Sequence, residues 1–174
     1  MGSYIQSDHG KYQGGLKSQG ANSSVIIGSH NRFAWSHLEP SPGQYNWGEI
    51  DSWLGKIQAA NKKAVLSIML RCEDNDSGDI CAPAWAVGSD YQPILVDAAK
   101  VPGSCGYTAT DPRLKRLNYL NTGVKEKIAA LLAAFGARYK DNPTISHIEL
   151  DVGYFGGNSK SFFPRCGEEN RAVY

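Results

Sequence analysis

Apolar positions recur at helical spacing in two parts of the chain. Over residues 49–63 they fall on one face of a helix. These positions are Ile50, Trp53, Leu54 and Ile57. Residues 121–143 give the clearest helical pattern, with Asn121 or Thr122 as a plausible N-cap and the sequence Asp-Asn-Pro as its stop. The pattern therefore predicts two helices separated by more than fifty residues.

Three apolar runs indicate strands. Residues 24–35 begin as a β-branched apolar run, and residues 64–70 are almost continuously apolar, as expected of a strand buried on both faces of a parallel sheet. Residues 144–156 are again strand-like and end in glycines. Strands alternating with helices predict a parallel α/β fold with right-handed crossovers.

The segments between these elements are less regular. Residues 73–112 are rich in Asp, Gly, Pro and Ser, and an excursion of this length is usually functional or carries short local structure. Residues 1–24 are rich in Gly and Ser, and we expect them to be poorly structured. They also lack the apolar stretch of a signal peptide. One folded domain is then predicted over residues 25–174.

Composition excludes several classes of protein. The chain has 174 residues, 41% hydrophobic and 20% charged, with a formal net charge of +1, and no basic stripe is visible. These values give no electrostatic argument for nucleic acid or an anionic membrane as a partner. No apolar run approaches the length of about 18 residues that spans a bilayer. The sequence indicates no cofactor and no metal site.

The four cysteines, at positions 72, 81, 105 and 166, form no Cys-x-x-Cys pair, which argues against a zinc site. Most of them lie in loop-like segments, which favours disulfides and an oxidising, extracytoplasmic compartment; free thiols in a cytosolic protein are the alternative. We expect at least one disulfide to tie down the excursion. Two Asn-x-Ser sequons, at Asn22 and Asn75, agree with export.

In parallel α/β proteins, functional residues gather at the carboxyl ends of the strands. The first strand ends near Arg32, Trp35, His37 and Glu39, and the second leads to Arg71 and then to Trp85. In the third, strand alternation places His147, Glu149 and Asp151 on the face opposite Ile148 and Leu150. Such polar groups are costly to bury without partners, and Arg32 and Arg71 are the obvious countercharges.

Several motifs together resemble the N-terminal half of a TIM-barrel glycoside hydrolase, closest to the β-galactosidase-like members of the large retaining clan. The motifs are Arg-x-x-Trp-x-x-Leu-Glu-Pro followed by Gly-x-Tyr-x-Trp from residue 32, Pro-x-Trp at residues 83–85, and Gly-x-Arg-Tyr before the last strand. The likeness extends over about residues 32–156. It implies an incomplete barrel, about half of the (β/α)8 fold, acting on β-linked saccharides.

The resemblance implies roles for particular residues. Glu149 or Asp151 is the candidate acid/base, and the candidate saccharide contacts are Arg32, Trp35, His37, Arg71 and Trp85. Aromatic rings stack on sugar faces while Arg and His bind hydroxyls. Packing roles remain the alternative for both tryptophans and for His37. Glu39 is expected to cap the turn that follows the first strand.

The chain also departs from the family pattern. Gly157 stands where relatives carry the acid/base glutamate, and no seventh strand is present to supply the nucleophile. Three hypotheses follow: a fragment of a larger hydrolase, which we favour; a half-barrel completed by self-association through its exposed sheet edges; or a non-catalytic carbohydrate-binding or structural domain.

Overall fold

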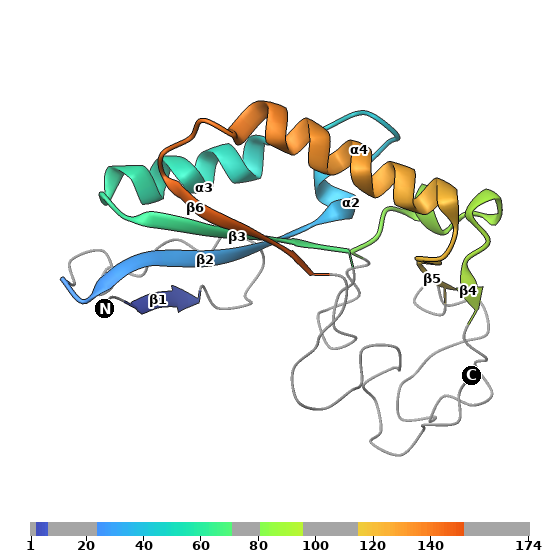
Figure 1. Ribbon diagram of the computed structural model, residues 1–174, viewed down its shortest axis with the longest axis horizontal. Helices are drawn as coiled ribbons and strands as arrows, with labels where there is room; N and C mark the ends of the chain where they lie inside the picture. Colours follow the sequence, from blue (N-terminus) through green and yellow to red (C-terminus); the bar gives the residue numbers. More distant parts are fainter. Residues whose placement is uncertain (1–2, 7–23, 71–80, 96–114, 152–174) are drawn as a thin grey trace, which may run out of the picture.

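The computed structural model describes residues 3–6, 24–70, 81–95 and 115–151. Its centre is a four-stranded parallel sheet in the order β1-β2-β3-β6 (Figure 1). The strands are β1 (Ser3–Gln6), β2 (Ile26–Ala34), β3 (Lys63–Met69) and β6 (Ile145–Asp151). The prediction of a parallel α/β fold is confirmed. The described residues form an open sheet and no closed barrel.

Strand β1 was not predicted. Its four residues lie in the segment 1–24, for which we expected little regular structure, and they pair in parallel with β2 from Ser3 opposite Ile26 to Gln6 opposite His30. Residues 7–23 lie outside the described part. The strand was missed because four residues are too few to show a periodic apolar pattern. It is recognised only from its pairing with β2.

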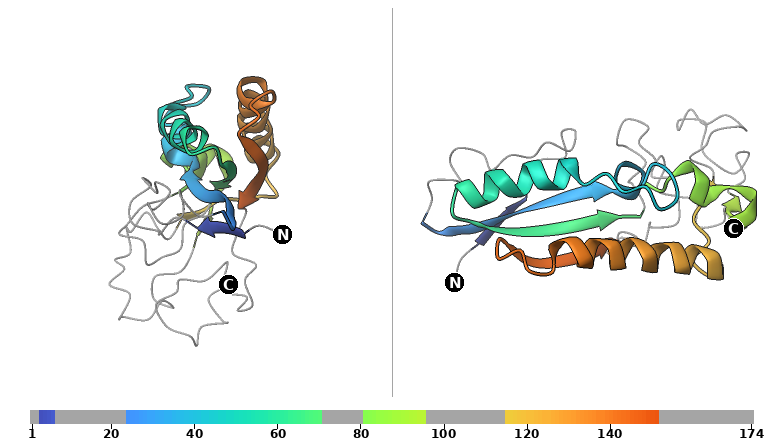
Figure 2. Two further views of the ribbon diagram at one scale, coloured as in Figure 1. Left: turned by 90° about the vertical axis from the view of Figure 1, so that its left-hand side faces the viewer. Right: turned by 90° about the horizontal axis from the view of Figure 1, so that it is seen from above.

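Helices α3 (Gly48–Ala59) and α4 (Thr122–Tyr139) cover one face of the sheet (Figures 1 and 2). The four apolar positions predicted for the first helix are the ones that α3 buries. Helix α4 begins at the predicted N-cap Asn121, whose side chain accepts a hydrogen bond from the Val124 amide at 3.2 Å. A single turn, α2 (Trp35–Leu38), follows β2 directly. Both long helices are therefore confirmed.

The core lies between this sheet face and the helices. On β3 it takes alternate side chains, Ala64, Leu66 and Ile68, which pack with Phe33 of β2. From α4 it takes Leu131 and Phe135, both essentially inaccessible to solvent. The alternation leaves Val65, Ser67 and Met69 on the opposite face of β3, and that face carries the polar residues discussed below.

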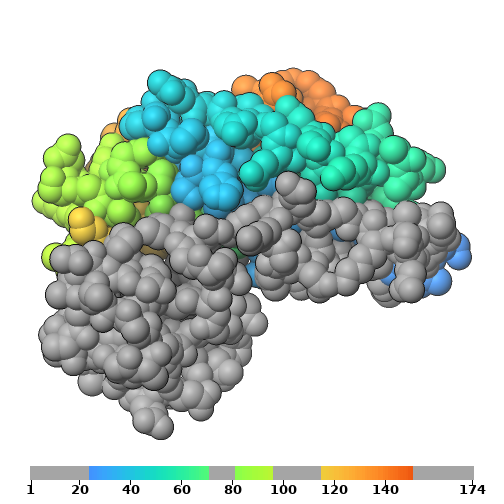
Figure 3. All heavy atoms as spheres, turned by 180° about the vertical axis from the view of Figure 1, so that it is seen from behind, coloured from blue at the N-terminus to red at the C-terminus, as the bar shows by residue number. Residues whose placement is uncertain are grey.

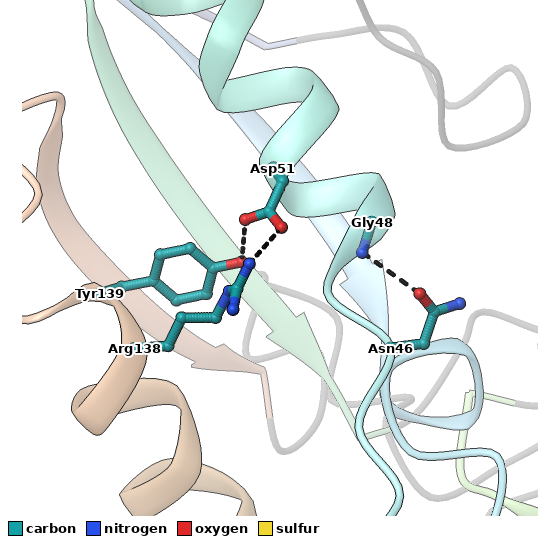
Figure 4. Close-up of polar contacts among 5 residues, drawn as sticks. All are labelled: Asn46, Gly48, Asp51, Arg138 and Tyr139. Carbon is teal, nitrogen blue, oxygen red and sulfur yellow. Dashed lines mark hydrogen bonds and ion pairs between the residues drawn. The ribbon is translucent and has the colours of Figure 1, made fainter.

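A polar cluster also joins the two helices (Figure 4). The Asp51 carboxylate of α3 accepts a hydrogen bond from the Tyr139 hydroxyl at 2.7 Å and pairs with Arg138 at 2.5 Å, both from α4. Burial, and then the hydrogen bond to Asp51, raise the pKa of Tyr139 well above its ordinary value. Close by, the Asn46 side chain accepts from the Gly48 amide at the start of α3.

Short local structure occupies the described parts of the long excursion, as expected. Two 3-10 turns, η1 (Ala84–Val87) and η2 (Ser89–Tyr91), lead to strand β4 (Ile94–Leu95), which pairs antiparallel with β5 (Lys115–Arg116) (Figure 1). In the space-filling view, residues 81–95 sit against the end of β2 and the turn after it (Figure 3). This segment therefore packs at the carboxyl end of the sheet.

Candidate functional site

The sheet face opposite α3 and α4, here called the inner face, carries a polar patch contributed by β2 and β6. Strand register gives its layout: His30 lies opposite Val65, which lies opposite His147. One row further toward the carboxyl ends, Arg32 lies opposite Ser67, which lies opposite Glu149. Residues in register on neighbouring strands share a face, so these rows form one surface.

Glu149 sits between two imidazoles. Its Oε2 is 3.3 Å from His30 Nε2, and its Oε1 is 3.7 Å from His147 Nε2. The Glu149 side chain is 49% exposed and His147 53%, whereas His30 is only 17% exposed. Both carboxylate oxygens thus face a nitrogen that can donate a hydrogen bond or carry a positive charge.

Arg32, the countercharge predicted for this strand, has a different environment. It lies on the inner face, half-buried, and its Nε–H is buried without a hydrogen-bond partner among the residues described. The ion pairs that Glu149 makes in this part of the chain go to His30 and His147. Sequence reasoning missed His30, because a histidine in mid-strand gives no signal until the register shows what lies across from it.

Asp151 ends β6, in register with Met69 and therefore one row closer to the carboxyl ends than Glu149. As the last residue of its strand, it lies at the carboxyl end of the sheet, where the sequence predicts functional residues. Arg71 and Gly157 lie outside the described residues, so the roles predicted for them stay predictions.

Trp35 belongs to the hydrophobic core between the sheet and the helices. Its ring is 0% exposed, and its indole N–H donates to Glu39 Oε2 at 2.7 Å. The other carboxylate oxygen of Glu39 accepts from the Gly43 amide at 2.8 Å. The expected capping role of Glu39 is confirmed. For Trp35 this geometry favours the packing role that the sequence left open, because a ring without exposed area offers nothing for a sugar to stack on.

Trp85 packs on the outer side of Trp35. The two rings meet edge to face with centroids 5.4 Å apart, and the indole N–H of Trp85 donates to the Glu39 backbone oxygen at 3.1 Å. The Tyr91 ring also packs edge to face on Trp85, with the two ring centroids 6.0 Å apart. Trp85 is only partly buried. It is therefore the tryptophan of this pair that keeps some area for a ligand, in an orientation fixed by Glu39.

His37 is separated from this group. Its Nδ1 is 3.6 Å from the Glu49 carboxylate at the start of α3, and both side chains are about two-fifths exposed. This contact joins α2 to α3. It favours the structural role that the sequence left open for His37.

The described residues contain no group of three His, Cys, Asp or Glu side chains arranged to hold a metal ion. Within the same residues, no helix has the length and apolar character needed to cross a membrane.

A comparison with known protein families shows to which family the chain belongs. A family model of glycoside hydrolases, described as β-galactosidase, matches residues 18–173. The chain belongs to this β-galactosidase family. The resemblance seen in the sequence motifs is confirmed.

Individual members of the family show distant similarity. The chain is 25% identical over 147 residues to a β-galactosidase from Arthrobacter sp. and 24% identical over 144 residues to the β-galactosidase BgaA from Thermus sp.. These matches cover 82% and 80% of this chain, but 18% and 19% of the relatives. The chain therefore spans about one fifth of the length of the curated family members it matches.

The fold agrees with this assignment. The crystal structure of a β-galactosidase from the psychrophilic Marinomonas ef1 superposes with a TM-score of 0.56 at 16% identity, covering 97% of this chain and 24% of that one. At this identity the likeness shows the fold alone. Within the family fold, the four parallel strands and their covering helices correspond to part of the larger protein.

Proposed function

We propose that this chain forms part of a glycoside hydrolase that acts on β-linked saccharides, with β-galactosides as the first substrates to test. The observation that carries the proposal is the polar inner face, where Glu149 lies between two imidazoles in a chain of the β-galactosidase family. Carboxylate and imidazole groups bind sugar hydroxyls and supply acid or base. Saccharide is the partner implied.

The proposed chemistry requires two carboxyl groups. Retaining hydrolysis uses an acid that protonates the leaving oxygen and a carboxylate that stabilises or traps the oxocarbenium-like centre, about 5–5.5 Å apart across the scissile bond. Glu149 and Asp151 are two residues apart on β6, so their backbones are separated by roughly 7 Å along one strand. Both approach a sugar from the same side. We therefore propose that this chain supplies one of the two carboxyls and that the remaining (β/α) units of a longer protein supply the other.

The same observation favours a second candidate function. A chain with both acidic candidates on one strand can bind a saccharide without hydrolysing it, which makes a non-catalytic carbohydrate-binding domain the alternative. Trp85, oriented by Glu39 and partly exposed, is the ring that we propose as the sugar platform. Trp35 is proposed to support it from below.

Two measurements on the 174-residue chain test these proposals. With a panel of aryl β-glycosides we expect no turnover at an enzymatic rate. Turnover that disappears in Glu149→Gln or Asp151→Asn would show instead that this chain carries a complete site.

The second measurement is an NMR titration with β-galactosides. We expect weak binding, with a Kd of about millimolar order, seen as shifts of the Trp85 indole signal and of the neighbouring Tyr91 ring signals. The Tyr91 shifts should be lost in Trp85→Ala. Trp47→Phe is the matched control, because Trp47 packs against Tyr45 and Phe135 on the helical side. Shifts that persist in Trp85→Ala would exclude Trp85 as the platform, and no shift with any glycoside would contradict saccharide binding by this chain.

We also propose that the chain works in an extracytoplasmic, oxidising compartment. Support comes from Cys81, which is 2% exposed and is not a free thiol. The other three cysteines lie outside the described residues. Intact mass after alkylation without reductant should show fewer than four modified cysteines, and four alkylated thiols in the native protein would overturn the proposal.

A further inference from the structure

We propose that His30 is a positioning residue that holds the Glu149 carboxylate against the inner face. The inference rests on the proposed function, in which Glu149 is one of two candidate carboxyls. It concerns a residue that the sequence patterns did not single out. The juxtaposition that carries it is the 3.3 Å contact between His30 Nε2 and Glu149 Oε2.

The contact crosses a whole strand. His30 is on β2 and Glu149 on β6, and β3 lies between them. The two strands are about 9.6 Å apart, twice the usual strand spacing, and Glu149 lies two residues, or roughly 7 Å, further along its strand than the row of His30. Both side chains therefore lean over β3 to meet. Below them β3 presents Val65 and Ser67, side chains short enough to leave room. Strand pairing alone would have put Arg32, in the same row, nearest to Glu149.

The two ends of the contact are not equally fixed. His30 is 17% exposed, and its strand has a neighbour on each side within the described sheet. Glu149 is 49% exposed and lies on the outer strand of that sheet. The imidazole is therefore the anchor and the carboxylate the group that is oriented. His147, 53% exposed and on the same outer strand, is less suited to this role.

Other charged groups share this face. Arg32 lies on β2, and His147 and Asp151 lie on β6, while the β3 residues in register with them are uncharged. The Glu149 charge favours the protonated form of a neighbouring imidazole. The orientation of Glu149 should therefore be linked to the protonation of His30, with the closer contact on the acidic side of the histidine titration.

NMR on the isotopically labelled 174-residue chain tests the link between the two groups. The imidazole signals of His30 and the carboxyl carbon of Glu149 are followed between pH 4.5 and pH 8.5. We expect the Glu149 carbon to respond to the His30 titration, and the His30 midpoint to fall in Glu149→Gln, which removes the negative charge beside the imidazole. The matched control is Glu49→Gln, which removes the carboxylate beside His37 and should leave His30 unchanged.

A second measurement separates positioning from mere proximity. Three-bond couplings of the Glu149 side chain should indicate one dominant rotamer in the native chain on the acidic side of the His30 titration and averaged rotamers in His30→Ala. His30→Gln, which keeps a donor but carries no charge, should give intermediate couplings. If His30→Ala does not fold, the glutamine variant and the pH titration still decide the question. An unchanged His30 midpoint in Glu149→Gln, or the same Glu149 couplings in all folded variants, would overturn the proposal. Neither readout uses a saccharide, so failure of the proposed function would be seen separately in the glycoside titration.

Discussion

At the scale of single residues, Glu39 shows how a charged side chain can serve the scaffold. It lies where β2 and α2 give way to the turn before α3, and it is 1% exposed. Its carboxylate accepts from Trp35 and Gly43, and its backbone oxygen accepts from Trp85. One residue therefore fixes the turn and both indole rings. Burial of Tyr45 raises the pKa of its phenol, and the negative charge of Glu39 raises it further.

Replacing Glu39 by Gln should destabilise the chain by about 1–3 kcal/mol. The amide has one oxygen for two donors, so either the buried Trp35 indole N–H or the partly buried contact of the Gly43 amide loses its acceptor. Urea denaturation followed by tryptophan fluorescence measures the change. Glu49→Gln, at an exposed position, should stay within about 0.5 kcal/mol. Equal effects of the two substitutions would contradict the role assigned to Glu39.

At the scale of elements, the two long helices are set by local signals and then joined by side chains. Helix α4 starts at Asn121, whose Oδ1 satisfies the Val124 amide. At its far end, Arg138 and Tyr139 reach Asp51 on α3 (Figure 4). The start of α4 is thus a local property, whereas its end is fixed to another helix.

Asn121→Ala should cost about 1 kcal/mol, the usual effect of removing an N-cap acceptor. Thr122, the other N-cap that the sequence allowed, is exposed and already helical. Thr122→Ala should therefore have little effect. Thermal unfolding monitored by circular dichroism distinguishes the two. A larger effect at Thr122 than at Asn121 would show that the cap has been assigned to the wrong residue.

The contact between α3 and α4 should also make the chain sensitive to alkali. Tyr139 has a raised pKa in the folded state, so above its ordinary value of about 10 the folded chain keeps a proton that the unfolded chain loses. Stability is then complete below pH 10 and falls as the pH rises toward the raised value. Urea midpoints between pH 8 and pH 11 should fall less steeply in Tyr139→Phe.

Arg138→Gln is the control for this pH dependence. It removes the ion pair with Asp51 but keeps the phenol, so the midpoints of this variant should still fall above pH 10. If native chain and Tyr139→Phe lose stability in parallel over this range, the phenol is not responsible.

At the scale of the whole molecule, the described sheet has two outer strands, β1 and β6. Several apolar side chains near it are exposed, among them Ile27 at 40% and Ile148 at 44%. Parallel sheets are normally covered on both faces, and an uncovered strand edge is a template for pairing with another chain. The described residues therefore include apolar side chains through which a second chain can associate.

We predict that the isolated chain self-associates in a concentration-dependent way. Static light scattering after size-exclusion chromatography measures the mass across a dilution series. Ile148→Lys should reduce association, because it places a charge on the outer strand. Leu120→Lys is a control at a site that is more exposed but lies away from the sheet. A folded monomer at all concentrations would contradict the prediction.

Much of the fold is predictable from the sequence, because the signals are local. The spacing of Ile50, Trp53, Leu54 and Ile57 defined the buried face of α3, and the continuous apolar run at residues 64–70 defined β3. The Leu-Glu-Pro motif and its neighbours also identified the family and the capping role of Glu39. Each of these signals is contained within a few turns of helix or a single strand.

The candidate site was only partly predictable, because its contacts join distant residues. The alternation along residues 144–151 placed His147 and Glu149 on one face, but it could not show that Glu149 meets His30 rather than Arg32. Likewise, nothing local distinguishes Trp35, which is fully buried, from Trp85, which keeps some exposed area. Hydrophobic periodicity fixes which face of an element is buried, whereas strand order and register decide what lies across from it. For this chain the sequence by itself determined the two long helices, the strands β2, β3 and β6, and the family. The tertiary structure added the short strands and decided the partners of the polar side chains.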